Sequence, residues 1–163
     1  MRRTLFGAAA AALAMLAIFA VSAALARTSH HPRGDDRGKT IQVIEHATSD
    51  TVIDNDPTGD SIGDTLAFGN AVFDPTDTTQ VGSDGGSCVR TVVGTSWECN
   101  WTTSLKYGQI TVEGPFLDAG DSTLAIIGGT GAYAEARGTM DLHARDAAGS
   151  AYDFTFHVID AGR

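Results

Sequence analysis

Residues 108–133 read GQITVEGPFLDAGDSTLAIIGGTGAY. Two segments of this stretch, 109–117 and 122–127, are rich in β-branched and apolar residues, and Gly and Asp residues separate them. Short apolar segments bounded by turn-forming residues are typical of β-strands. The stretch therefore predicts two strands, and the same pattern continues on both sides of it.

Alternation of apolar and polar residues is clearest near the C-terminus. In residues 151–159, an aromatic or aliphatic side chain stands at every second position from Tyr152 to Val158. This period indicates a strand with one buried face, whereas helical periodicity is nearly absent after Ala26. A loop rich in Asp, Gly and Pro is predicted for residues 49–64. The other predicted strands are 41–46, 65–72, 88–92, 95–103 and 139–145.

The composition indicates an all-β domain with many tight turns. The chain contains 19 glycines, and turns and bulges between short strands often need the backbone conformations that glycine allows. A closed barrel has no exposed strand edges, which favours a barrel over a sandwich. Composition alone does not choose between the two.

The two cysteines predict the register of one hairpin. A two-residue turn at residues 93–94 can join strands 88–92 and 95–103. In that register Cys88 lies directly opposite Cys99, at a separation that a disulfide can bridge. Two independent thiols are the alternative interpretation.

The same register brings further side chains together. Arg90 lies opposite Trp97, and Trp97 and Trp101 share the face that carries the cysteines. Burial of large indole rings contributes strongly to stability. We therefore expect this face to point inward.

The N-terminus has the features of an export signal. Arg2 and Arg3 precede an apolar segment, 5–26, which ends in the small-residue cleavage pattern Ala-Leu-Ala. This order predicts a signal peptide over residues 1–26 and a secreted, extracellular protein. A membrane anchor that is not cleaved is the alternative, because the segment is long enough to span a bilayer.

The mature part is acidic and large enough for one domain. Loss of residues 1–26 removes two bases and changes the formal net charge from −9 to −11, so nucleic acid and anionic membrane surfaces are unsuitable partners. Residues 27–39, rich in His, Arg, Asp and Gly, predict a disordered lead-in. Residues 40–163 form the predicted barrel domain.

Three ordered motifs resemble those of allene oxide cyclases and dirigent proteins. GQITVEGPFL at 108–117 continues into DSTLAIIGGTGAY at 121–133, and both are similar to consecutive segments of plant allene oxide cyclases. Upstream, IGDTLAFGN at 62–70 resembles a third segment, and residues 128–138 are equally similar to dirigent proteins. The resemblance implies an eight-stranded antiparallel β-barrel with an elongated apolar cavity, which is often oligomeric in plants, so a homo-oligomer is one expected assembly.

The resemblance also implies candidate site residues. Glu45 matches the cyclases' inward glutamate, which is thought to stabilise positive charge, and it shares the phase of the apolar Ile41 and Val43. A buried carboxyl should have a raised pKa or be held by hydrogen-bond donors. Asn70 matches the family's strand-two asparagine, which fixes a substrate oxygen through water. The alternatives are a Glu45 that faces solvent and an Asn70 that caps a turn.

Other side chains are predicted to form the cavity wall. The family's cavity cysteine corresponds to Cys88, here a predicted disulfide partner of Cys99, and Phe68, Trp97 and Trp101 are predicted to contact the ligand. The chain departs from the cyclase pattern at residues 45–47, where Glu-His-Ala replaces Glu-x-Asn.

No metal site and no cofactor are predicted. Residues 54–60 resemble the start of a calcium loop, but Thr65 stands where a bidentate glutamate is required.

Two classes of function fit these observations. One is an isomerase or cyclase that needs no cofactor, in which Glu45 and Asn70 are catalytic and the barrel folds a small apolar substrate for ring closure. The other is a non-catalytic exported barrel that binds a lipid, terpenoid or phenolic molecule, or guides a coupling reaction as dirigent proteins do.

Overall fold

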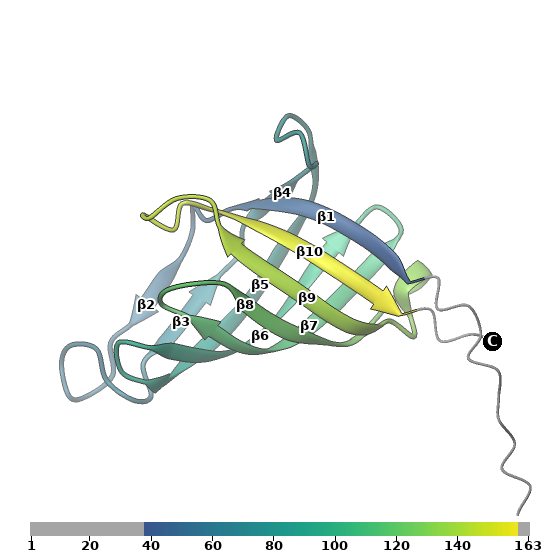
Figure 1. The fold of residues 1–163 in the computed structure, drawn as a ribbon. Helices are drawn as coiled ribbons and strands as arrows, with labels where there is room; N and C mark the ends of the chain where they lie inside the picture. The colour runs from purple at the N-terminus through teal and green to yellow at the C-terminus, as the bar shows by residue number, and fades with distance from the viewer. Residues whose placement is uncertain (1–37, 160–163) are drawn as a thin grey trace, which may run out of the picture. The chain divides into compact units, whose positions relative to one another are not determined.

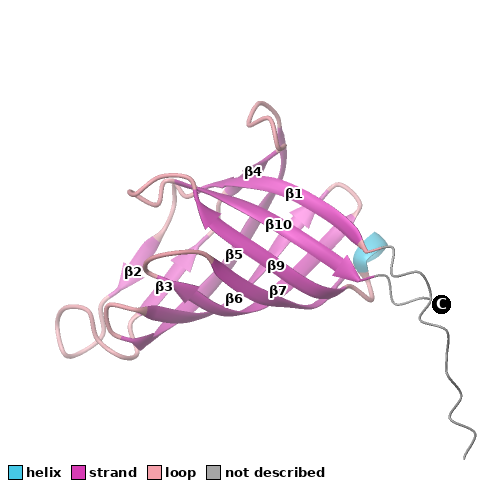
Figure 2. Cartoon of the chain, viewed as in Figure 1, coloured by secondary structure: helices cyan, strands magenta, loops and turns pink. Residues whose placement is uncertain are grey.

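The computed structural model describes residues 38–159, which form a closed barrel of antiparallel strands (Figures 1 and 2). The predicted signal peptide and all but the last two residues of the predicted lead-in lie outside the described residues. The strands are β1 Lys39–His46, β2 Thr51–Ile53, β3 Thr65–Phe68, β4 Ala71–Phe73, β5 Gln80–Val92, β6 Ser96–Leu105, β7 Gly108–Leu117, β8 Ser122–Gly129, β9 Arg137–Ala144 and β10 Ala151–Ile159, with one short 3-10 helix, η1 Gly131–Tyr133, between β8 and β9.

The ten strands make eight staves of one barrel. The sheet runs β4-β1-β10-β9-β8-β7-β6, and β5 closes it by pairing with β6 on one side and with β3 and β4 on the other. Because β1 pairs with β4 and β2 pairs with β3, β1 and β2 are two pieces of one stave, and β3 and β4 are two pieces of the next. The predicted eight-stranded antiparallel barrel is confirmed, with two of its staves broken.

Neither break was predicted from the sequence. Strand β2 lies inside the predicted loop 49–64, and the predicted strand 65–72 is interrupted at Gly69-Asn70. At the second break the backbone of Asn70 still pairs with that of Asp84, through N···O distances of 3.1 and 2.9 Å. Pairing to β5 therefore continues across the gap, and the alternation of inward side chains is preserved.

The barrel interior is filled at one end and hollow at the other. Phe154 and Phe156 of β10 are buried as the alternation predicted, and burial of such a side chain contributes about 2–3 kcal/mol. Ile44, on the other face of β1 from Val43, is also buried and pairs with Phe73 of β4. The residues that pack the interior include Val72, Ile110, Val112, Leu124, Ile126, Met140, Leu142, Phe154 and Phe156.

The predicted hairpin register is confirmed through the cysteines. Cys88 pairs with Cys99 and Arg90 with Trp97, and the two cysteines form a disulfide. The turn differs from the prediction, because a bulge after Arg90 shifts the register so that Val92 pairs with Ser96. A disulfide is consistent with an oxidising extracellular compartment. Among residues 38–159, no helix has the length and hydropathy needed to cross a membrane.

Candidate active site

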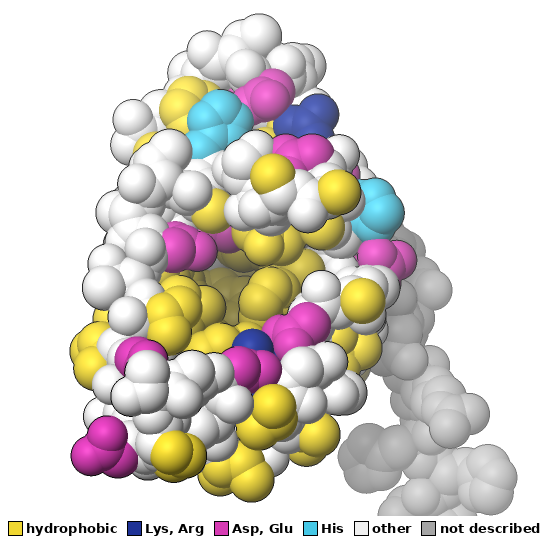
Figure 3. Space-filling view, turned by 90° about the vertical axis from the view of Figure 1, so that its left-hand side faces the viewer, with side chains coloured by type: hydrophobic (Ala, Val, Ile, Leu, Met, Phe, Trp, Pro, Cys, Tyr) yellow, Lys and Arg dark blue, Asp and Glu magenta, His cyan; other side chains and the backbone are white. Residues whose placement is uncertain are grey.

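One end of the barrel contains a cavity of about 420 Å³. Figure 3 shows it as a hollow that opens between apolar side chains, with acidic groups at its rim. Eight of the ten strands and the loop before β10 contribute to its wall. The lining residues are Glu45, Ala47, Asp50, Val52, Leu66, Phe68, Cys88, Trp97, Cys99, Trp101, Phe116, Leu142, Ala148, Gly149, Tyr152 and Phe154.

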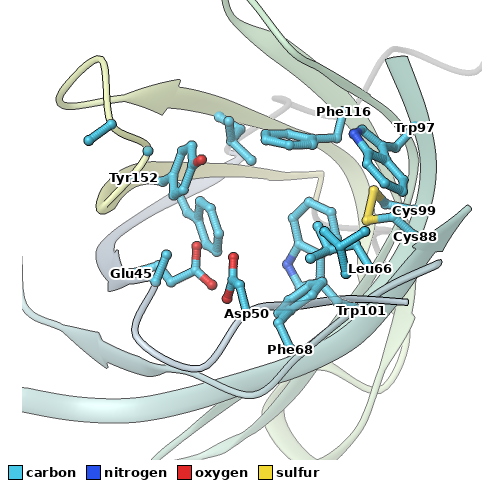
Figure 4. Close-up of a pocket in the computed structure, with 16 residues that line it drawn as sticks. Glu45, Asp50, Leu66, Phe68, Cys88, Trp97, Cys99, Trp101, Phe116 and Tyr152 are labelled. Carbon is cyan, nitrogen blue, oxygen red and sulfur yellow. A yellow bond between two sulfur atoms is a disulfide. The ribbon is translucent and has the colours of Figure 1, made fainter. Parts of the chain in front are cut away.

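Aromatic rings form much of the cavity wall (Figure 4). Trp101 contacts Phe68 edge to face, with ring centroids 5.9 Å apart, and lies against Phe154 at 5.7 Å. A glycine makes this packing possible, because a Cβ at Gly86 would lie 2.3 Å from the Trp101 Cβ. The missing side chain at Gly86 therefore lets Trp101 pack close to β5, where it lines the cavity.

An acidic group faces the aromatic wall. Glu45 lies on the inward face of β1, and its side chain is only 5% exposed. The Asn70 amide donates hydrogen bonds to Glu45 Oε1, at 2.8 Å, and to Asp50 Oδ1, at 2.7 Å. The Asn70 Oδ1 atom accepts from the backbone N–H groups of Thr48 and Ser49. Asn70 thus fixes Glu45 and ties the segment after β1 to the cavity mouth.

Asp84 completes what we call the acid cluster: Glu45, Asp50, Asn70 and Asp84. Asp84 is buried on β5, and its carboxyl group is close enough to that of Glu45 for each to affect the pKa of the other. Asp84 Oδ1 accepts a hydrogen bond from the Asn70 backbone N–H, at 3.3 Å, whereas Asp84 Oδ2 has no hydrogen-bond partner among the described residues.

Burial controls the protonation of this pair. Burial, with the negative charges of Asp84 and Asp50, raises the pKa of Glu45 to about 9, against the opposing effect of the Asn70 hydrogen bond. Burial also raises the pKa of Asp84 to about 6. At neutral pH the two carboxyl groups together therefore hold one proton and carry one negative charge.

Tyr152 adds a hydroxyl group to the same side of the cavity. It lies across from Glu45 in the β1–β10 ladder, and its ring meets Phe116 edge to face. Burial, and next the charge of Glu45, raises the pKa of the Tyr152 hydroxyl. The group therefore stays protonated and can donate a hydrogen bond.

A second polar group, which we call the arginine cluster, consists of Arg90, Trp97, Asp118 and Asp60. Arg90 is 7% exposed and stacks on Trp97, with its guanidinium carbon 3.9 Å from the ring centroid. Its Nη1 lies 2.7 Å from Asp118 Oδ1, its Nε lies 2.6 Å from Asp60 Oδ1, and Trp97 Nε1 donates to Asp118. This cluster fastens the loop after β2 to the β5–β6 hairpin, since Asp60 also accepts from the Gly94 N–H.

The structure brings the candidate residues to one region. Phe68, Cys88, Trp97 and Trp101 all line the cavity, although their contact with a ligand stays a prediction. Glu45 is buried, so the solvent-facing alternative is wrong. Asn70 lies behind the lining, where it holds the acids.

Sequence reasoning missed Asp50, Asp84 and Tyr152 as members of the site. Asp84 shares its phase with Cys88 on β5, so the period-two pattern could have revealed it had the strand been extended upstream. The alternation predicts Tyr152 on the apolar face of its strand and gives no indication of a polar role. Asp50 has no comparable signal in the sequence, because it falls in the loop predicted for residues 49–64.

The architecture defines the class first: an eight-stave antiparallel barrel with a cavity of small-molecule size and a buried acid. The family model for allene oxide cyclase matches residues 41–155, and this chain therefore belongs to the allene oxide cyclase family. A search of curated proteins gave no significant match.

Solved structures with different activities share this fold. A pyocyanin demethylase is 27% identical with a TM-score of 0.62, and the match covers 72% of this chain and 100% of that one. A pterocarpan synthase dirigent protein is 15% identical with a TM-score of 0.63, covering 76% and 96%. A Diels-Alderase from Streptomyces koyangensis is 12% identical with a TM-score of 0.58, covering 78% and 72%.

Proposed function

We propose that this protein is an exported isomerase or cyclase that acts on a small, largely apolar substrate in the barrel cavity without a cofactor. One observation carries the proposal: Glu45 is a buried carboxyl group that faces an apolar, aromatic wall, and burial raises its pKa so that it favours the protonated form. A protonated carboxyl group in such a site donates a strong hydrogen bond to an oxygen of the substrate.

The residues divide the chemistry between positioning and acid catalysis. Phe68, Trp101 and Phe116 would hold a flexible substrate in one folded shape, which lowers the entropic barrier to ring closure. Glu45 would donate a proton or a hydrogen bond to the substrate oxygen, and Asn70 would keep the Glu45 carboxyl in position. Because isomerisation neither adds nor removes atoms, a proton given by Glu45 returns to it before the product leaves.

The comparisons support ring closure as the reaction class. The family name and one structural neighbour, a Diels-Alderase, both denote ring-forming enzymes on this fold. The demethylase and the dirigent protein have other activities, so the fold alone does not determine the reaction. The predicted signal peptide and the disulfide support action outside the cell.

Occupancy of the cavity can be tested with the protein's own fluorescence. The chain has two tryptophans, Trp97 and Trp101, and both line the cavity. We expect a neutral apolar dye, N-phenyl-1-naphthylamine, to quench their emission at saturation with simple one-site behaviour. Absence of quenching and of any dye binding would contradict a ligand-accessible cavity.

Catalysis can be tested without knowing the substrate. Extracts of the producing culture would be incubated with wild type, with Glu45→Gln and with the exposed control Glu113→Gln, then separated and analysed by mass spectrometry. An isomerase converts a compound into a new peak of identical mass, and we expect this conversion with wild type and Glu113→Gln alone. Equal binding of a co-purified molecule by all three proteins without conversion would indicate the carrier instead.

A further inference from the structure

The cavity gathers negative charge without a basic partner. Glu45 and Asp50 line it and Asp84 lies behind Glu45, whereas the described lining residues include no Lys, Arg or His. The buried Arg90 does not fill this role, because its guanidinium is held by Asp60 and Asp118. Carboxyl groups in a site of low dielectric constant attract a cation strongly when no protein cation is present.

The walls of the cavity suit a flat cation. The cavity that Glu45 and Asp50 line is also lined by the aromatic rings of Phe68, Trp101 and Tyr152 (Figure 4). The faces of aromatic rings attract cations, most strongly where water is excluded. A volume of about 420 Å³ falls within the range of small-molecule sites, and it fits a molecule of two or three fused rings.

An unpaired donor supplies an independent sign of a ligand. Trp101 is 3% exposed, and its Nε1–H has no hydrogen-bond partner among the described residues. Figure 4 shows this nitrogen directed toward the side of the cavity where Asp50 lies. Buried N–H groups are nearly always paired, so an acceptor on a bound molecule would complete the site.

We propose that the natural ligand contains a flat aromatic group with a positively charged nitrogen, bound against Asp50 and beside the Glu45–Asp84 pair, and a hydrogen-bond acceptor, bound to Trp101 Nε1. The inference rests on the proposed function for the location of the site and adds the chemical class of the substrate. Recognition of this ligand requires no turnover, so it can be tested by binding alone.

Three bicyclic probes of nearly equal size isolate the effect of charge. Calorimetric titration would compare 1-methylquinolinium, a cation, with 1-methylnaphthalene, which is neutral, and 1-naphthoate, an anion. We expect the cation to bind about tenfold more tightly than the neutral probe, because it gains both Coulombic and cation–π attraction. The anion should bind most weakly.

Matched variants assign the preference to the acid cluster. Asp50→Asn removes one carboxylate at the cavity mouth, and we expect it to lower the preference for the cation to about threefold or less. Glu113→Gln makes the same change of net charge on the exposed face of β7 and should leave the preference intact. Thermal melting of each variant would confirm that it is folded.

A fourth probe tests the acceptor. We expect 6-acetyl-1-methylquinolinium to bind wild type more tightly than the unsubstituted cation and to lose this advantage in Trp101→Phe. Equal affinities for the cation and the neutral probe, or tightest binding of the anion, would overturn the inference while leaving an occupied cavity and the proposed function standing. Failure of every probe to bind would overturn both.

Discussion

The acid cluster and the arginine cluster use the same strand in opposite ways. Asp84 and Arg90 both point inward from β5, six positions apart, and both are buried. Arg90 is matched by two carboxylates and an indole ring, whereas Asp84 and Glu45 have no cationic partner among the described residues and both accept hydrogen bonds from Asn70. The paired charges of the arginine cluster suit a structural role, because a buried ion needs partners to be stable. The acid cluster lacks a cationic partner beside the cavity, and such perturbed groups are typical of functional sites.

The largest effect should follow from breaking the arginine cluster. Arg90→Leu removes the cation and leaves Asp60 and Asp118 together beside Trp97. Because the buried Arg90 loses two ion pairs and its stacking on Trp97, while the two carboxylates left behind are partly exposed, we expect about 3 kcal/mol lower free energy of unfolding. Urea denaturation would measure it, with Arg90→Lys as a control of intermediate loss. A change below about 1 kcal/mol would place Arg90 among ordinary surface residues.

The acid cluster should instead make the protein less stable as pH rises. The folded-state pKa of Glu45, about 9, exceeds the unfolded value of 4.5, so between these values the folded state holds more protons and loses stability with increasing pH. Relative to Glu45→Gln, we expect the free energy of unfolding of wild type to fall by about 2–3 kcal/mol from about pH 5 to about pH 8. One group can contribute at most about 1.4 kcal/mol per pH unit, or about 4 kcal/mol over this range. Parallel urea titrations at several pH values would test this slope, and identical slopes would mean that Glu45 titrates normally.

Introduction of a fourth carboxyl group into the acid cluster should make its stability depend more strongly on pH. Asn70→Asp keeps the acceptor for the Thr48 and Ser49 N–H groups but removes the donors to Glu45 and Asp50. We expect a loss of about 2 kcal/mol near neutral pH that shrinks in acid, where the introduced carboxyl group is protonated and can donate again. Stability that does not depend on pH in this variant would show that Asn70 acts through packing alone.

The smallest effect should come from the outer partner of Arg90. The Asp60 side chain is 39% exposed, so its ion pair is screened by water, and Asp60→Asn should cost about 1 kcal/mol or less. Asp118→Asn should cost more, because Asp118 also accepts the Trp97 indole N–H. The order of the two variants in thermal melting would test this, and the reverse order would mean that Asp60 carries the fastening.

Strand alternation and one hairpin register were sufficient to predict most of the barrel. β10 was predicted with the bounds that the structure shows, because its aromatic residues alternate without interruption. Pairing of Cys88 with Cys99 followed from placing a turn between two strands. The closed barrel could be chosen over a sandwich only through the family motifs, because local patterns do not specify how a sheet closes.

The acid cluster was predicted only in part, for a physical reason. The first half of β5, which includes Gly82, Gly85 and Gly86, has low intrinsic strand propensity and forms through pairing to β4 and β6. Asp84 lies in that half, so its inward position was not predicted from the sequence. The pKa of Glu45 depends on this neighbour and on burial, which no spacing in the sequence reveals.

The two broken staves have a consequence for engineering. Strands β5 to β10 are continuous and form the frame of the barrel. Residues 47–53, which include Asp50, form one edge of the cavity, here called the lip. The lip pairs with β3 over three residues, Thr51–Ile53, and contributes little to the frame's hydrogen-bond ladder. Exchange of this lip is therefore a route to new ligand selectivity that leaves the scaffold unchanged.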